Sequence, residues 1–171
     1  MKIYITGLSG TGKTSIVEAL LKKGIRAIDI DDDLGHWENK HTNEHTEWHP
    51  GKDDEWHRKH TWLCDVESLK KRLAETEHVV VVGSADNQSD YVTLFDKVFV
   101  LRCRPEVFLA RIQERTTNDF GKLPPEQRRL LTWQRTFETE MVQKGAIPLD
   151  AERPLEKVVE DILVHLNSNP H

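Results

Sequence analysis

Short runs of valine and isoleucine alternate along the chain with longer stretches of helical character. Five of these runs predict β-strands, and most of them are followed directly by Gly, Asp or Ser: Lys2–Thr6, Arg26–Ile30, His78–Gly83, Lys97–Leu101 and Ala146–Leu149. Within the third run, Val79–Val82 is apolar at every position, which is typical of a strand covered on both faces in a parallel sheet. The pattern therefore predicts a buried parallel sheet.

The segments between these strands predict helices. Their expected bounds are Gly12–Lys23, about Asp53–Ala74, Pro105–Arg115, Pro125–Lys144 and Pro154–Leu166. The last three begin at a proline, which the first turn of a helix tolerates. Strands that alternate with helices indicate βαβ units with helices on both faces of the sheet. We therefore predict an α/β three-layer sandwich with a five-stranded parallel sheet, as a single domain over residues 1–171.

Length and composition narrow the classes of function. The 171 residues are 31% charged and 37% hydrophobic, with a net charge of -5. No apolar run approaches the roughly 20 residues of a membrane-spanning helix, and the N-terminus reaches Gly7 too early for a signal peptide. The acidic balance argues against a nucleic-acid partner. Two cysteines, Cys64 and Cys103, form no CxxC pair, which fits a cytoplasmic protein with ordinary core thiols.

Residues 31–62 differ in kind from the rest of the chain. They hold six of the nine histidines and four of the five tryptophans, and their nine acidic and four basic residues give a net charge of -5. The segment follows the second predicted strand, so it should lie near the carboxyl edge of the sheet, where ligands of open α/β sheets bind. We expect it to form part of a binding site.

The run Gly7-Leu8-Ser9-Gly10-Thr11-Gly12-Lys13-Thr14 fits the pattern G-x-x-x-x-G-K-[ST] between a predicted strand and a predicted helix. Glycines at this spacing let backbone N–H groups point into one concavity, at a helix N-terminus that favours anions. Lys13, expected to be a surface charge, would reach the outer phosphates of a nucleotide, and the Thr14 hydroxyl would ligate Mg²⁺. The alternative is a glycine-rich turn that only starts a helix. The predicted phosphate-binding residues are Gly7, Ser9, Gly10, Thr11, Gly12, Lys13, Thr14 and Ser15.

With this loop in place, nearly the whole chain resembles the small P-loop kinases of the nucleoside-monophosphate-kinase-like group, such as shikimate, gluconate and adenylate kinases. Three further stretches carry the resemblance: Asp29-Ile30-Asp31, Arg111-Ile112-Gln113-Glu114-Arg115, and Ala146–Ala151 followed by Pro154. The resemblance implies a sheet order of 2-3-1-4-5, an acceptor-binding segment at residues 31–62 and a short lid at residues 116–124. It also implies ATP as the phosphate donor and Mg²⁺ as the metal.

The resemblance implies roles for single residues as well. Asp29 would hold metal-bound water and Asp31 would take the proton of the acceptor hydroxyl; alternation along a strand should put both on one face. Arg115 would meet the transferring phosphate, so the expected catalytic residues are Lys13, Asp31 and Arg115. Thr14 and Asp29 are the expected metal-binding residues. The residues expected around adenine are Arg111, Ala151 and Pro154.

The acceptor side departs from the family pattern. No arginine occurs between Val79 and Leu101, and Arg58 is the only arginine in residues 31–62, although arginine forks are the usual way to hold a phosphate or carboxylate. Carboxylates and amides suit hydroxyls and amines instead. The alternatives are a solvated acidic turn, and tryptophans that only pack the segment onto the domain. The predicted acceptor-binding residues are Asp31, Asp32, Trp37, Trp56, Asp86 and Asn87.

Histidine spacing in the same segment raises the question of a metal. His41, His45 and His49 are four residues apart, and on a helix they would line one face, as zinc ligands can. Pro50 and Gly51 argue against a stable helix there. We therefore do not predict a zinc site from this spacing.

Together these features predict an ATP- and Mg²⁺-dependent small-molecule kinase, as a monomer or homodimer. Its expected acceptor is a hydroxyl of a neutral or cationic molecule, such as a sugar, nucleoside or amino-sugar, because the acceptor side is acidic and rich in tryptophan. An adenylate-kinase-like regulatory ATPase and a nucleoside monophosphate kinase are the alternatives. A GTPase is disfavoured because the chain has no N-K-x-D base-reading motif.

Overall fold

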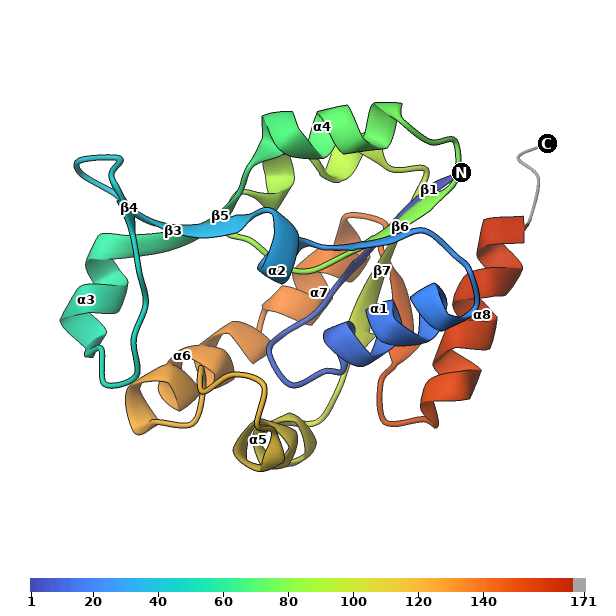
Figure 1. The fold of residues 1–171 in the computed structure, drawn as a ribbon. Helices are drawn as coiled ribbons and strands as arrows, with labels where there is room; N and C mark the ends of the chain where they lie inside the picture. Colours follow the sequence, from blue (N-terminus) through green and yellow to red (C-terminus); the bar gives the residue numbers. More distant parts are fainter. Residues whose placement is uncertain (168–171) are drawn as a thin grey trace.

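The computed structural model describes residues 1–167 and contains a parallel sheet of five strands (Figure 1). All of its strands pair in parallel, and the four valines of β6 are buried beside β1. The α/β class and the parallel sheet are therefore confirmed. The strands are β1 Lys2–Thr6, β2 Ala27–Asp29, β6 Val79–Val82, β7 Lys97–Arg102 and β8 Ile147–Asp150.

The sheet has the order β2-β6-β1-β7-β8, and a second sheet explains why these labels differ from the expected 2-3-1-4-5. Counted within the parallel sheet alone, β6, β7 and β8 are the third, fourth and fifth strands, so the spatial order is the expected one. The second sheet is antiparallel, with order β4-β3-β5, and its strands come between β2 and β6 in the chain. Its strands are β3 Gly35–Asn39, β4 His45–Thr46 and β5 His60–Cys64.

Helices cover both faces of the parallel sheet, which gives the predicted three layers (Figure 1). On one face, Ile3, Ile5 and Phe99 pack with α1 (Lys13–Lys22), α5 (Pro105–Glu114) and α8 (Leu155–Asn167). On the other face, Tyr4 and Val81 pack with α4 (Val66–Ala74) and two 3₁₀ turns (Gln88–Asp90 and Val92–Leu94), and α7 (Phe137–Gln143) packs on Val100. Cys64 and Cys103 are buried free thiols, as expected.

The predicted helix at Asp53–Ala74 is interrupted by a strand. The structure contains α3 (Asp54–Lys59), then β5, then α4. Residues of β5 pair with β3 along its whole length, and this non-local pairing overrides the local helical pattern. Helix α4 then starts anew, because the Asp65 carboxylate accepts a hydrogen bond from Ser68 N at 3.0 Å.

Two other boundaries also differ from prediction. The helix expected at Pro125–Lys144 is divided into α6 (Pro124–Gln134) and α7, where Thr136 N donates to Trp133 O three residues back. Strand β2 ends at Asp29, and residues 30–33 form the short helix α2 (Ile30–Asp33). Asp29 caps this helix by accepting a hydrogen bond from Asp31 N at 2.9 Å. The expectation that Asp29 and Asp31 share one face of a strand is therefore wrong.

Within residues 1–167, no helix combines the length and the apolar composition needed to cross a membrane.

Candidate active site

The phosphate-binding loop joins β1 to α1 and curls through two glycines with positive φ. Gly10 and Gly12 have φ angles of 83° and 95°, which residues with side chains rarely adopt. A Cβ atom at Gly10 would lie 2.5 Å from the carbonyl oxygen of Phe108, so the loop packs tightly against α5. Thr11 Oγ1 donates to Leu8 O at 2.8 Å and closes the curl. The glycine spacing therefore fixes a concave loop at the start of α1.

Lys13 points into this loop and is buried. Its ammonium Nζ donates to Gly7 O at 2.8 Å and to Leu8 O at 3.1 Å, and the residue is only 8% exposed. The expectation of a surface charge is wrong, because the curled loop wraps around the ammonium group. Burial lowers the pKa of Lys13, while the negative charges of Asp31 and Asp29 act in the opposite direction. A phosphate in the loop would offer this ammonium oxygen partners of opposite charge.

Side chains and backbone of the remaining loop residues surround Lys13. Gly7 leaves no room for a side chain, because a Cβ atom there would lie 2.8 Å from Cβ of Leu101. Ser9 is partly exposed in the loop, and Thr14 and Ser15 are exposed on the first turn of α1. All eight residues predicted for phosphate binding therefore belong to one contiguous loop and helix start.

The two aspartates after β2 lie in different environments. Asp29 is 6% exposed, and burial, followed by the charge of Asp31, raises its pKa to about 6. Asp31 is exposed, and its Oδ1 accepts a hydrogen bond from Trp62 Nε1 at 3.3 Å. The Asp29 carboxylate is thus buried within electrostatic range of Lys13. The Asp31 carboxylate is accessible to solvent and is oriented by the indole N–H of Trp62.

A cavity of about 500 Å³ opens beside the phosphate-binding loop. Lys13 is the one basic residue among its lining residues in the described chain. Four carboxylates also line the cavity: Asp31, Asp32, Asp86 and Glu140. Aromatic side chains form much of the wall: Trp37, Trp48, Trp62, Phe120, Trp133 and Phe137. The predicted site residues that the structure brings together here are Ser9, Lys13, Asp31, Asp32, Trp37 and Asp86.

Two predicted acceptor residues lie outside the lining. The Trp56 ring stacks on His60 with centroids 4.1 Å apart and meets the Trp37 ring edge-on at 5.1 Å. The Asn87 side chain accepts a hydrogen bond from Cys64 N at 2.9 Å and donates to Cys64 O at 3.0 Å. Trp56 therefore contacts the lining residue Trp37, whereas Asn87 holds the backbone of Cys64. A direct role of either residue in acceptor binding stays a prediction.

Three lining residues were missed because they depend on an unpredicted helix break, and a fourth, Trp62, lies on an unpredicted strand. Trp62 lies on β5, within a stretch predicted as helix, and its backbone N donates to Asp86 Oδ2 at 3.1 Å. Trp133 lies on α6, whereas Phe137 and Glu140 lie on α7, so the break between these helices decides how they are placed. The tryptophan-rich composition of residues 31–62 already indicated Trp62 as a candidate for the wall of a binding site, but no local signal indicates the other three.

Glu126 connects residues 31–62, the predicted acceptor-binding segment, to residues 116–124, the predicted lid. It is fully buried on α6, where Oε2 accepts from Gly121 N at 2.8 Å and Oε1 accepts from Trp48 Nε1 at 3.1 Å. His57 Nε2 lies 3.8 Å from the same Oε1. Burial raises the pKa of Glu126, and the hydrogen bonds act in the opposite direction. The sequence gives no sign of this role, because a glutamate in a helix is usually exposed.

The two arginines of the lid region take different partners. Arg115 Nε donates to Asn118 O at 3.2 Å, and its Nη2 donates to Phe120 O, so it holds residues 116–124 from within. Burial lowers the pKa of Arg115, and the charge of Asp31 opposes this. Arg111 Nη2 donates to Ala151 O at 3.0 Å, which brings together two residues predicted for the adenine side. Pro154 lies directly before α8.

The residues present fit a nucleoside triphosphate with Mg²⁺. The loop offers a buried ammonium group and a concave backbone at the N-terminus of a ten-residue helix, which suits phosphate. The exposed Thr14 hydroxyl and the buried Asp29 carboxylate provide hard oxygen donors near this loop, and Mg²⁺ prefers such ligands.

A protein-family model named AAA_18, an AAA domain, matches residues 3–134, which is most of the chain. The chain belongs to this AAA domain family. The match contains the phosphate-binding loop, the acceptor-binding segment, the lid and α6. The resemblance of this AAA domain to the small P-loop kinases of the nucleoside-monophosphate-kinase-like group is also confirmed.

Individual relatives of this AAA domain are kinases by name. A "Putative adenylate kinase" from Methanocaldococcus jannaschii is 32% identical over 116 residues, which cover 67% of this chain but 59% of the relative's length. The structure of deoxyadenosine kinase from M. mycoides with bound dATP matches 98% of this chain and 100% of its own, with a TM-score of 0.58 and 17% identity. Shikimate kinase from Aquifex aeolicus matches 97% and 96%, with a TM-score of 0.54 and 21% identity. These structural matches show a shared fold.

Proposed function

We propose that the protein is an ATP- and Mg²⁺-dependent phosphotransferase that acts on a hydroxyl of a small neutral or cationic molecule of sugar, nucleoside or amino-sugar type. One observation carries this proposal: the cavity beside the phosphate-binding loop is acidic and aromatic, and Lys13 is its one basic lining residue in the described chain. Kinases among the relatives support phosphoryl transfer as the chemistry.

Three side chains would act on the reacting groups. Lys13 would hold the outer phosphates, Asp31 would accept the proton of the acceptor hydroxyl, and Arg115 would bring positive charge to the transferring phosphate. Thr14 and Asp29 would hold Mg²⁺, which when bound would neutralise negative charge on the phosphates. Catalysis of this reaction is mainly positioning and charge stabilisation, so the cavity beside Lys13 matters as much as any single group.

The charge of the acceptor follows from the cavity wall. Asp31, Asp32, Asp86 and Glu140 would repel an anionic acceptor, and close like-charge contacts can cost several kcal/mol. The same carboxylates accept hydrogen bonds from hydroxyl and amine groups. The indole faces of Trp37 and its neighbours would cover a ring, and a cation over such a face gains roughly 0.5–2 kcal/mol. A sugar, nucleoside or amino-sugar meets these requirements.

The test is a screen for ADP release from Mg·ATP in the presence of sugars, nucleosides, amino-sugars, nucleoside monophosphates and shikimate. We expect a neutral or cationic hydroxyl compound to stimulate release most. Efficient turnover of AMP, CMP or shikimate instead would contradict the charge argument. Thermal shift in the same panel reports binding, because a ligand of the folded state at 100 times its Kd adds about 2.7 kcal/mol of stability.

Asp31→Asn tests the assigned base with the identified acceptor. We expect kcat to fall by about 10²–10⁴-fold, since this is the usual contribution of a positioned base, while the KM for ATP changes little. Asp33→Asn is the matched control on the same short helix, because Asp33 lies outside the lining and pairs with Arg72 at 3.2 Å. Equal losses in both variants would remove the role of Asp31.

A nucleoside monophosphate kinase, or a regulatory ATPase of adenylate-kinase type, is the second candidate. The name of the Methanocaldococcus jannaschii relative favours it, over 67% of this chain. Rapid ATP hydrolysis without any acceptor would identify the ATPase, and AMP-dependent ADP formation would identify the monophosphate kinase.

A further inference from the structure

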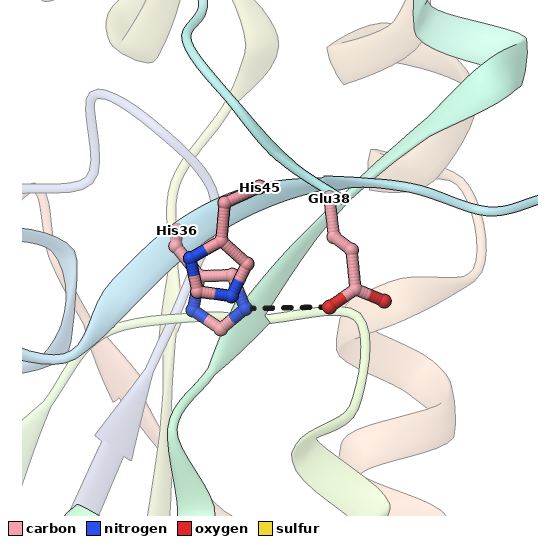
Figure 2. Close-up of side chains that lie close together, drawn as sticks. All are labelled: His36, Glu38 and His45. Atoms are coloured by element: carbon pink, nitrogen blue, oxygen red, sulfur yellow. Dashed lines mark ion pairs between the residues drawn. The ribbon is translucent and has the colours of Figure 1, made fainter. Parts of the chain in front are cut away.

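Three potential metal ligands converge on one face of the antiparallel sheet: His36, Glu38 and His45 (Figure 2). The two histidine rings lie one over the other, and the Glu38 carboxylate points toward the His36 ring. None of the three lines the cavity beside Lys13, so the cluster is separate from the proposed phosphotransferase site.

Strand geometry explains why these residues meet. His36 and Glu38 are two residues apart on β3, so their side chains leave the same face of the strand. Glu38 stands directly opposite His45 in the register of the β3–β4 pair, and residues opposite each other in such a pair lie side by side. Trp37, between the two β3 ligands, faces the other way and lines the cavity.

The distances between the ligand atoms of the cluster approach the distances between ligand atoms around a bound zinc ion. His36 Nε2 lies 3.7 Å from Glu38 Oε2, and one ligand atom from each of the three residues lies within 4.8 Å of the others. Ligands about 2.0–2.1 Å from a tetrahedral zinc ion are about 3.4 Å from each other. The His36 and His45 rings are stacked with centroids 4.1 Å apart, so a rotation of one ring would complete the geometry.

The chemistry of the donors selects the ion. Two imidazole nitrogens and one carboxylate oxygen are a common set for Zn²⁺ with a fourth position left to water, whereas Mg²⁺ prefers oxygen ligands alone. The His36 and Glu38 side chains are 24% and 20% exposed, so the sheet holds them while an ion can still reach them from solvent.

We propose that His36, Glu38 and His45 form a Zn²⁺ site, with water as the fourth ligand. The ion would fasten β4, a strand of only two residues, to β3. Beyond β4 the chain leads to Trp48, which lines the cavity and donates to Glu126. Zinc would therefore stabilise the acceptor-binding segment from the face opposite Trp37. Binding of zinc here does not depend on the proposed phosphotransferase activity.

The experiment titrates untagged, nucleotide-free protein with Zn²⁺ by calorimetry, with Mg²⁺ as the comparison ion. We expect one Zn²⁺ per chain and no comparable binding of Mg²⁺. Loss of even an outer-shell partner costs about 10–100-fold in metal affinity, so loss of a direct ligand in His36→Ala or His45→Ala should cost more than about 100-fold. Glu38→Gln, which keeps the side-chain volume, should weaken zinc in the same direction.

His41→Ala and His49→Ala are the matched controls, because both histidines are exposed in the same segment and neither belongs to the cluster. We expect them to bind zinc like the wild type. Circular dichroism and thermal melting of each variant separate loss of the site from loss of the fold, and zinc should raise the melting temperature of the wild type and controls only. The absence of stoichiometric zinc binding, or full binding in a folded His36→Ala/His45→Ala variant, would overturn the proposal.

Discussion

The Lys13 side chain both closes the phosphate-binding loop and provides its charge. Its ammonium group donates to two carbonyl oxygens of the same loop, at 2.8 Å and 3.1 Å. Its burial follows from the curl that Gly10 and Gly12 permit, not from apolar surroundings. At the scale of one residue, the ammonium group of Lys13 therefore serves both phosphate binding and the stability of the loop. A variant of Lys13 is expected to change both properties.

Lys13→Met keeps the length of the side chain and removes the ammonium group. We expect it to abolish phosphoryl transfer, because the outer phosphates lose their cation. It should lower the free energy of unfolding by no more than about 1–3 kcal/mol, the range for a buried acceptor left without a donor. Activity assays and denaturant melts check the two effects, and wild-type turnover in the folded variant would contradict the kinase proposal.

Gly10→Ala tests the conformation of the loop. Its φ of 83° costs a side-chain residue about 1–2 kcal/mol, and its Cβ would also lie 2.5 Å from Phe108 O. Gly24→Ala is the matched control, because its φ is 74° and a Cβ there would have no atom within 4 Å. We expect denaturant melts to show a clearly larger loss of stability for Gly10→Ala. Equal losses would mean that the loop relaxes away from α5.

The predicted lid and the predicted acceptor-binding segment both contact α6. Glu126 of α6 accepts from Gly121 in the lid and from Trp48 in the segment. Arg128 of the same helix pairs with Asp54 of α3 at 2.9 Å. The lid is also fixed from its other end, since Arg115 donates to two carbonyl oxygens within it. A movement of the predicted lid would therefore also displace residues that line the cavity.

Arg111 and Arg115 should give different kinetic signatures. Arg115→Ala should lower kcat more than it raises the KM for ATP, because we expect the charge of Arg115 to meet the transferring phosphate. Arg111→Ala should mainly raise the KM for ATP, because Arg111 donates to Ala151 O on the expected adenine side. Steady-state kinetics of both variants, with Arg115→Lys to retain the charge, check this division. Unchanged kinetics in both would remove the lid assignment.

At the scale of the whole molecule, buried His57 packs between residues 31–62, the predicted acceptor-binding segment, and residues 116–124, the predicted lid. His57 is 1% exposed and lies among the rings of Trp37, Trp56 and Phe120 at centroid distances of 5.9, 5.1 and 6.2 Å. In the described part of the chain, neither of its ring nitrogens has a hydrogen-bond partner. Burial, followed by the charge of Arg129, lowers the pKa of His57 to about 4.

This pKa predicts acid sensitivity of the fold. An unfolded histidine binds a proton below about pH 6.5, whereas folded His57 resists protonation down to about pH 4. The unfolded state therefore binds more protons between these values, and stability falls as the pH drops from about 6.5 to about 4. We expect His57→Leu to lessen this fall in thermal melts across the range. Carboxylates that titrate in the same range are present in both proteins, so a difference between the two curves reports on His57. An unchanged pH dependence would contradict the shifted pKa of His57.

Features that depend on neighbours in the chain could be predicted from the amino-acid sequence. The eight residues of the phosphate-binding loop are consecutive, so the glycine spacing alone fixed the curl and the position of Lys13 at the start of α1. The valines of Val79–Val82 indicated a strand buried on both faces, because a short run of β-branched apolar residues favours a strand over a helix and leaves neither face polar. Residues 31–62 were marked as unusual by composition alone.

Contacts between residues far apart in the chain became known only from the three-dimensional structure. Strand β5 exists because it pairs with β3, and the antiparallel sheet places Trp62 in the cavity and His45 opposite Glu38. The regular spacing of His41, His45 and His49 proved irrelevant to the cluster of ligands, because β4 is a strand rather than a helix. Burial of Glu126 and His57 likewise depends on segments distant in sequence, and hydrophobic patterns cannot indicate a buried polar residue before its partners are placed.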